Sequence, residues 1–157
     1  MTTVFRGRTA TRSGAGVVLV VTAAAFTWPW GFDKVAMPAD GTGAAEVVAT
    51  YLAALNAHDC DTAAALAAES FASIAREWCG DVASLGDIRV GDGVDEDPSW
   101  TGLPARSDVV SVPATFDLDW LWLRSDGSMP EGATAWGYRL TRSAPEAPWR
   151  ITDNGLG

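Results

Sequence analysis

The feature that most constrains the fold is a strict alternation of side chains in the last third of the chain. From Asp108 the sequence DVVSVPATFDLDWLWL places apolar residues at every second position. Because successive side chains of a strand point to opposite faces, the alternation predicts a long strand in a sheet that is covered on one side only. The predicted covered face carries Val110, Val112, Ala114, Phe116, Leu118, Trp120 and Trp122.

Further strands are predicted on both sides of this one. The stretch ATAWGYRLT from Ala133 alternates again, and the turn SDGSMPEG precedes it. GDIRVG offers an earlier strand and PWRIT a final one. The residues expected to point inward from the two later strands are Trp136, Tyr138, Leu140, Trp149 and Ile151.

The first half of the chain has the spacing of helices instead. Residues 44–57, AAEVVATYLAALNA, repeat apolar side chains at intervals of three and four, which predicts an amphipathic helix. Asp61 is the predicted N-cap of a second helix and Ser70 that of a third, which Gly80 ends. Helices followed by antiparallel strands predict an α+β fold.

The amino-terminal residues predict a membrane segment. Residues 1–13 are basic, and residues 14–32 form an uncharged run just long enough to cross a bilayer as a transmembrane helix. Because the basic residues come first, we expect the amino terminus in the cytoplasm and everything downstream outside it. Residues 33–43 would then be a linker and residues 44–157 an exported domain on a single-pass anchor in the cell membrane.

A cleaved signal peptide is the competing interpretation. The small residues Ala23, Ala24 and Ala25 supply what a signal peptidase requires, and cleavage there would secrete the domain. Both interpretations export the folded part. The formal net charge of −9 disfavours binding to nucleic acid and docking on anionic lipid headgroups.

Cys60 and Cys79 are the two cysteines of the chain. Their spacing is not the C-x-x-C of a redox pair, and two cysteines beside one histidine do not supply the four ligands of a structural zinc site. Cys60 precedes the second predicted helix and Cys79 follows the third, so an antiparallel hairpin would bring them within disulfide distance. In an exported domain this bond is expected, and free reactive thiols are the alternative.

Three parts of the sequence carry a family resemblance. They are AAEVVATYLAALNAHDCDTAAAL with the later WCGD, the long alternating strand, and the terminal stretches WGYRLTRS and PWRITDNGLG. Together they resemble the small NTF2-like (SnoaL-like) domains that actinobacteria export behind a single membrane segment. The resemblance implies a cone, in which a curved antiparallel sheet wraps around the first long helix and opens at one end to a pocket. Family members include isomerases, cyclases and dehydratases as well as non-catalytic scaffold, transport and secretion-accessory modules, so membership leaves the function open.

Aromatic residues of the predicted inner face are the candidates for lining a ligand pocket. They are Trp120, Trp136, Tyr138 and Trp149, for which core packing is the alternative role. Asp153 follows Trp149 on the same predicted side and is the candidate carboxylate at the pocket mouth. Its alternative role is in a turn at the end of the strand.

The residues predicted on the inner face give little support for acid or base catalysis. An enzyme of this fold needs a titrating group on the inner face, and none of the residues predicted there in the long strand titrates. Asp117, Asp119 and Arg139 are expected on the outer face as charge pairs, and His58 is expected in a turn. The acidic stretch DGVDED lacks the spacing of a calcium-binding EF-hand and is expected to be a solvated loop.

The predicted function is a membrane-tethered extracytoplasmic binding or assembly module of the cell envelope, with no cofactor and no metal. Its partner would be a cell-envelope protein or a small apolar ligand. The alternative is a small SnoaL-like isomerase, dehydratase or hydrolase that uses Asp153 or His58 together with Tyr138. A homodimer through the outer sheet face is a third hypothesis, although the charges there disfavour an extensive apolar interface.

Overall fold

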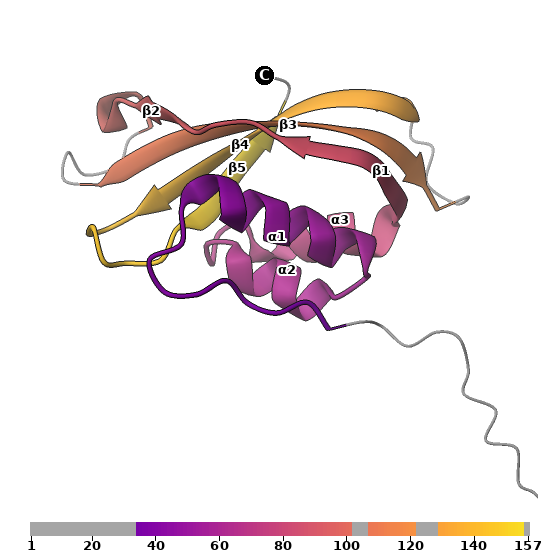
Figure 1. Cartoon of the computed structure of the whole chain (residues 1–157), viewed down its shortest axis with the longest axis horizontal. Helices are drawn as coiled ribbons and strands as arrows, with labels where there is room; N and C mark the ends of the chain where they lie inside the picture. The colour runs from indigo at the N-terminus through magenta and orange to yellow at the C-terminus, as the bar shows by residue number, and fades with distance from the viewer. Residues whose placement is uncertain (1–33, 102–106, 122–128, 156–157) are drawn as a thin grey trace, which may run out of the picture. The chain divides into compact units, whose positions relative to one another are not determined.

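Helices and then an antiparallel sheet follow one another along the chain, in the order that the change of apolar spacing predicts. The computed structural model describes residues 34–101, 107–121 and 129–155. Within these residues the helices lie against one face of the sheet, and the sheet curves over them (Figure 1). The fold is therefore α+β, as expected.

The first two helices follow each other closely. The predicted helix at residues 44–57 is confirmed as α1 (Ala44–Asn56). The next helix, α2 (Cys60–Leu66), begins two residues earlier than predicted, because its N-cap is Asp59 and not Asp61. A carboxylate oxygen of Asp59 accepts the backbone N–H of Thr62 at 3.3 Å, which satisfies one of the free donors at the helix start.

The third helix, α3 (Ala72–Asp81), packs beside α2 and is joined to it covalently. It follows Phe71 without a side-chain cap, so the predicted cap Ser70 lies outside the helix. Cys60 and Cys79 form a disulfide with a Cα–Cα distance of 5.4 Å. The expected staple is therefore confirmed, and it ties the start of α2 to the last turns of α3.

The sheet is antiparallel and has the strand order β1-β3-β4-β5, with β2 paired to β3 as well. A short 3-10 helix, η1, lies between β2 and β3. The bounds are β1 (Val82–Val90), β2 (Val94–Glu96), η1 (Pro98–Trp100), β3 (Asp108–Trp120), β4 (Gly132–Arg142) and β5 (Arg150–Gly155).

The predicted alternation of the long strand is confirmed in β3. Its residues that face the helices are buried, whereas Pro113, Thr115, Asp117 and Asp119 are exposed on the opposite face. We call the helix-facing side the inner face and the opposite side the outer face. The inner face and the helices share one core, to which the largest fully buried side chains belong: Tyr51, Leu52, Leu55, Leu66, Leu118, Tyr138, Leu140 and Ile151.

The segment expected to be a linker is held against the helices at its amino-terminal end. One carboxylate oxygen of Asp59 accepts the backbone N–H of Val35 at 3.0 Å and the hydroxyl of Thr62 at 2.8 Å. Asp59 is only 6% exposed. Hydrogen bonds from the Thr62 side chain and then from the Val35 backbone hold the pKa of this carboxyl below its usual range. Val35 is therefore fixed against the start of α2.

Within the described ranges, no helix is long and apolar enough to cross a membrane. The predicted transmembrane segment at residues 14–32 lies outside those ranges, as do the basic residues 1–13 and Trp122. The membrane anchor therefore stays a prediction.

Candidate functional site

Tyr138 lies at the centre of a group of aromatic and polar side chains on the inner face. The side chain is 0% exposed and meets the ring of Tyr51 from α1 edge-on, with 5.7 Å between the ring centroids. Asn154 of β5 is the register partner of Tyr138, so the two side chains lie next to each other on the same face. Trp136 precedes Tyr138 by two positions in β4 and shares that face as well. Residues from one helix and two strands thus meet around Tyr138.

The polar atoms of this group are buried without partners. The hydroxyls of Tyr51 and Tyr138, Nε1 of Trp136 and Nδ2 of Asn154 have no hydrogen-bond partner among the residues that the structure describes. Buried polar groups in native proteins are nearly always paired, because leaving one unpaired costs free energy. We call these four residues the donor cluster, and four orphaned atoms on neighbouring side chains single it out from the rest of the core.

Burial also fixes the protonation of the two tyrosines. Loss of solvent raises the pKa of Tyr51 and of Tyr138 well above their ordinary range. For Tyr138 the neighbouring Tyr51 adds to the effect. Both hydroxyls therefore stay protonated at neutral pH, so they act as hydrogen-bond donors and not as bases.

A row of three indoles borders the donor cluster. Trp78 of α3 lies 5.3 Å from Trp120 and 5.8 Å from Trp136, measured between ring centroids, and each pair of rings is tilted. Nε1 of Trp120 donates to the carbonyl of Met129 at 3.0 Å, so this indole is satisfied. All three tryptophans are half-buried. The row therefore extends the aromatic surface from Trp136 toward solvent.

Trp149, the remaining aromatic candidate, lies apart from this group. It is buried before the start of β5, and the guanidinium of Arg142 lies 4.6 Å from its ring centroid. Together with Asp108 and other residues it lines an open depression of about 430 Å³. Arg142 also forms an ion pair with Asp108 at 2.7 Å. The aromatic residues predicted to share one pocket are thus divided between two places.

Asp153 is on the outer face, and its predicted position beside the inner pocket is wrong. Arg139 pairs with Asp153 and Leu140 with Ile151, so one step along β4 corresponds to two along β5. Thr152 is the extra residue of this β-bulge, and it reverses the alternation that the sequence pattern assumed. The carboxylate of Asp153 is 61% exposed and forms an ion pair with Arg139 at 3.2 Å.

His58 occupies the turn between α1 and α2, as expected. Its ring nitrogen Nδ1 lies 3.3 Å from the carbonyl oxygen of Cys79, and its backbone has a φ of 54°. This contact lets the imidazole donate to the backbone beside the disulfide. The residue therefore has a structural partner and does not lie in the donor cluster.

Titrating groups are scarce in the interior. Besides Tyr51 and Tyr138, the buried polar or charged residues in the described part of the chain are Asp59 and Thr62, which bond to each other and to Val35. The same ranges hold no group of three or more histidine, cysteine, aspartate or glutamate side chains that would suit a metal ion. What the inner face offers is hydrogen-bond donors in an aromatic setting.

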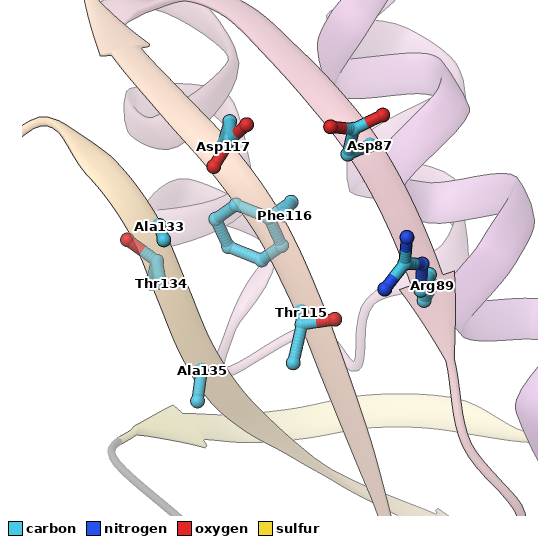
Figure 2. Close-up of a pocket in the computed structure, with 8 residues that line it drawn as sticks. All are labelled: Asp87, Arg89, Thr115, Phe116, Asp117, Ala133, Thr134 and Ala135. Carbon is cyan, nitrogen blue, oxygen red and sulfur yellow. The ribbon is translucent and has the colours of Figure 1, made fainter.

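The outer face has a different character. An open depression of about 360 Å³ lies on this face. It is lined by Ala133 and Ala135 from β4 and by charged residues from β1 and β3 (Figure 2). The charges there are those of Asp87, Arg89 and Asp117. Further along the sheet, Arg139 bonds to Glu96 at 2.9 Å as well as to Asp153, which confirms the outer position of Arg139. The outer face is thus shallow and charged.

Three residues of the site were not among those predicted for it. Tyr51 is one of the apolar positions at helical spacing in residues 44–57, a pattern that predicts a core side chain, and its ring does lie in the core. Regular alternation from Ile151 would turn Asn154 outward, and the bulge at Thr152 brings it to the inner face. Trp78 has the helical spacing of an apolar stripe, and that spacing does not predict the tilted contact of its ring with Trp136.

Comparisons with known proteins add little to this geometry. No protein-family model matches the chain, and the search of curated proteins gives no match. Among solved structures, the chain is similar to a SEC-C motif containing protein from Rhodopseudomonas palustris. The TM-score is 0.46 at 13% identity, and the match covers 76% of this chain and 82% of that one. So distant a likeness assigns neither a family nor a function.

Proposed function

We propose that the protein is an extracytoplasmic binding module of the cell envelope, tethered by its amino-terminal segment, which takes a small ligand on the inner face of the sheet. One observation carries the proposal. Four buried polar atoms of the donor cluster lack hydrogen-bond partners among the described residues. A ligand that supplies acceptors there would repay the desolvation cost that these groups bear in the free protein.

The NTF2-like assignment is part of the proposal. It is supported by α1 packing across the inner face of a curved antiparallel sheet and by the sequence stretches that resemble the family. In a cone of this type the ligand would lie between α1 and the sheet. The contact of Tyr51 with Tyr138 spans the same two elements.

A binding role agrees better with the site than the enzymatic alternative does. A SnoaL-like isomerase, dehydratase or hydrolase would use Asp153 or His58 as its acid or base. Asp153 is paired with Arg139 on the outer face, and His58 contacts the backbone of Cys79. The donor cluster brings neutral tyrosines, an indole and an amide, which orient a ligand but do not remove its protons.

Native mass spectrometry of the full chain, purified from the cell envelope in a mild detergent, tests the binding role. We expect a small molecule that stays bound to the wild-type chain and is lost from the double variant Tyr51→Phe, Tyr138→Phe. The variant Thr115→Val, which removes an exposed hydroxyl from the outer face, is the control and should keep the molecule. A folded wild-type chain that carries no bound molecule would contradict the proposal.

The location is tested with the same material. An intact mass two hydrogens below that of the reduced chain would show the disulfide in the protein from cells. The same mass shows whether the residues up to Ala25 are retained, which separates a membrane anchor from a cleaved signal peptide. Recovery of reduced, full-length chain in the cytoplasmic fraction would refute export.

A further inference from the structure

The orphaned atoms of the donor cluster share one chemical property. An indole Nε1 and an amide Nδ2 only donate hydrogen bonds, and a tyrosine hydroxyl that stays protonated always has a proton to donate. The four atoms belong to Tyr51, Trp136, Tyr138 and Asn154. The ring of Tyr51 in α1 contacts that of Tyr138 in β4, and Asn154 in β5 is the register partner of Tyr138. None of the four atoms has a hydrogen-bond partner in the described part of the chain. Whatever pairs with them must therefore bring acceptors.

The charges near the donor cluster further restrict the class of ligand that it can bind. The described basic side chains nearest in sequence to the cluster are those of Arg139, Arg142 and Arg150. Arg139 and Arg142 are engaged with carboxylates, and Arg150 donates to the carbonyl of Trp149 at 3.2 Å. Arg150 precedes the inner residue Ile151 and pairs with Thr141, so its side chain is directed to the outer face. Arg139 pairs with Glu96 and Asp153 on the outer face, away from Tyr138. A buried anion without a paired cation is strongly unfavourable, and the chain as a whole carries a net charge of −9. An anionic ligand would thus meet donors but no compensating charge.

The apolar surroundings of the donor cluster further define the ligand that it can bind. The donors lie among aromatic rings: Tyr51 contacts Tyr138, and Trp136 contacts Trp78, which also contacts Trp120. Aromatic surroundings with a few fixed donors favour a flat apolar ligand that carries a small number of acceptor atoms.

We propose that the donor cluster selects an uncharged, largely apolar ligand whose polar atoms are hydrogen-bond acceptors, such as a carbonyl oxygen held by the hydroxyls of Tyr51 and Tyr138. The inference rests on the proposed binding function and specifies the chemistry of its ligand. It also explains the lack of internal partners, because donors already paired within the protein would gain less from the ligand.

Matched probes of equal size test this selection. Acetophenone carries a carbonyl, α-methylstyrene has the same shape with a CH₂ in place of the oxygen, and benzoate is an anion. Binding to the full chain in detergent is followed through the indole N–H signal of Trp136 in nitrogen-15 NMR spectra, assigned with Trp136→Phe. Free probe concentrations are set from protein-free micelles.

We expect acetophenone to shift the Trp136 signal and to bind about threefold to tenfold more tightly than α-methylstyrene, the range expected for one or two hydrogen bonds. Tyr51→Phe and Tyr138→Phe should each weaken acetophenone by a similar factor and leave α-methylstyrene unchanged. Thr115→Val is the matched control on the outer face and should alter neither affinity.

Each other outcome overturns the inference in a distinct way. Equal binding of acetophenone and α-methylstyrene would show that the donors are not used, although the binding function would stand. Tightest binding by benzoate would refute the selection for an uncharged ligand. If none of the three probes shifts the Trp136 signal, the proposed ligand chemistry is wrong. The bound molecule in native mass spectrometry then decides separately whether the binding function survives.

Discussion

Replacing Tyr51 by phenylalanine removes one buried hydroxyl and leaves the ring in its place against Tyr138. Replacing Tyr138 by phenylalanine likewise removes its hydroxyl and leaves its ring in place against Tyr51. Both side chains are 0% exposed, and both hydroxyls lack a partner in the described residues. Each hydroxyl therefore lowers the stability of the ligand-free protein by the cost of an unpaired buried polar group, about 1–3 kcal/mol.

We expect each single variant to raise the free energy of unfolding of the ligand-free chain by about 1 kcal/mol. The two effects should not add fully, because the rings of Tyr51 and Tyr138 are in contact. Urea unfolding of the full chain in a mild detergent measures the change through tryptophan fluorescence, which these substitutions leave in place.

Thr62→Val is the matched control, because it also removes a single hydroxyl from a buried position. That hydroxyl donates to a carboxylate oxygen of Asp59 at 2.8 Å, so its loss should lower the free energy of unfolding by about 2 kcal/mol. Opposite signs at Tyr51 and Thr62 would identify the tyrosine hydroxyl as unsatisfied. If Tyr51→Phe and Tyr138→Phe destabilise the protein as much as Thr62→Val does, the hydroxyls have partners and the argument for a ligand loses its basis.

Three further predictions concern the framework of the domain. Breaking the bond between Cys60 and Cys79 by a double serine substitution should lower the free energy of unfolding by about 3 kcal/mol, as expected for a loop of this length; equal stability with and without reductant would contradict this. The pKa of Asp59 is lowered in the fold, so its stabilising effect is present above about pH 4 and is lost as the pH falls further. The gap in unfolding free energy between wild type and Asp59→Asn should therefore narrow from pH 7 to pH 3, and a constant gap would refute the assignment. Gly93→Ala should destabilise by about 1–3 kcal/mol, because its Cβ would lie 2.6 Å from a methyl group of Val110; an unchanged urea midpoint would show that Val110 moves aside freely.

The sequence predicts most of the fold because its periodicities are strong. Alternation locates the buried face of β3, and helical spacing locates α1 within one residue of its observed end. The disulfide follows from the position of Cys60 and Cys79 at the outer ends of two short helices. These features depend on the local order of residues and on the lengths of the helices, and both can be read directly from the sequence.

The candidate site is less predictable because it depends on how strands pair. Regular alternation places Asp153 inside and Asn154 outside, and the bulge at Thr152 reverses both. No residue type or spacing near Thr152 predicts the bulge. Whether the hydroxyl of Tyr51 finds a partner is likewise decided by α1 and β4 together, and neither segment alone carries that information.

The ion pair between Arg139 and Asp153 bears on the register of β5 as well as on stability. As an exposed salt bridge it contributes little to stability. A slip of β5 by one residue, however, would place Asp153 opposite Tyr138 and turn Asn154 to solvent, because a change of register exchanges the two faces of a strand. The interior would then hold a carboxylate among protonated tyrosines. The bulge at Thr152, with Arg139 as the outer partner of Asp153, thus decides which group lies beside Tyr138: the same sequence, paired one step differently, would present an acid where it now presents an amide.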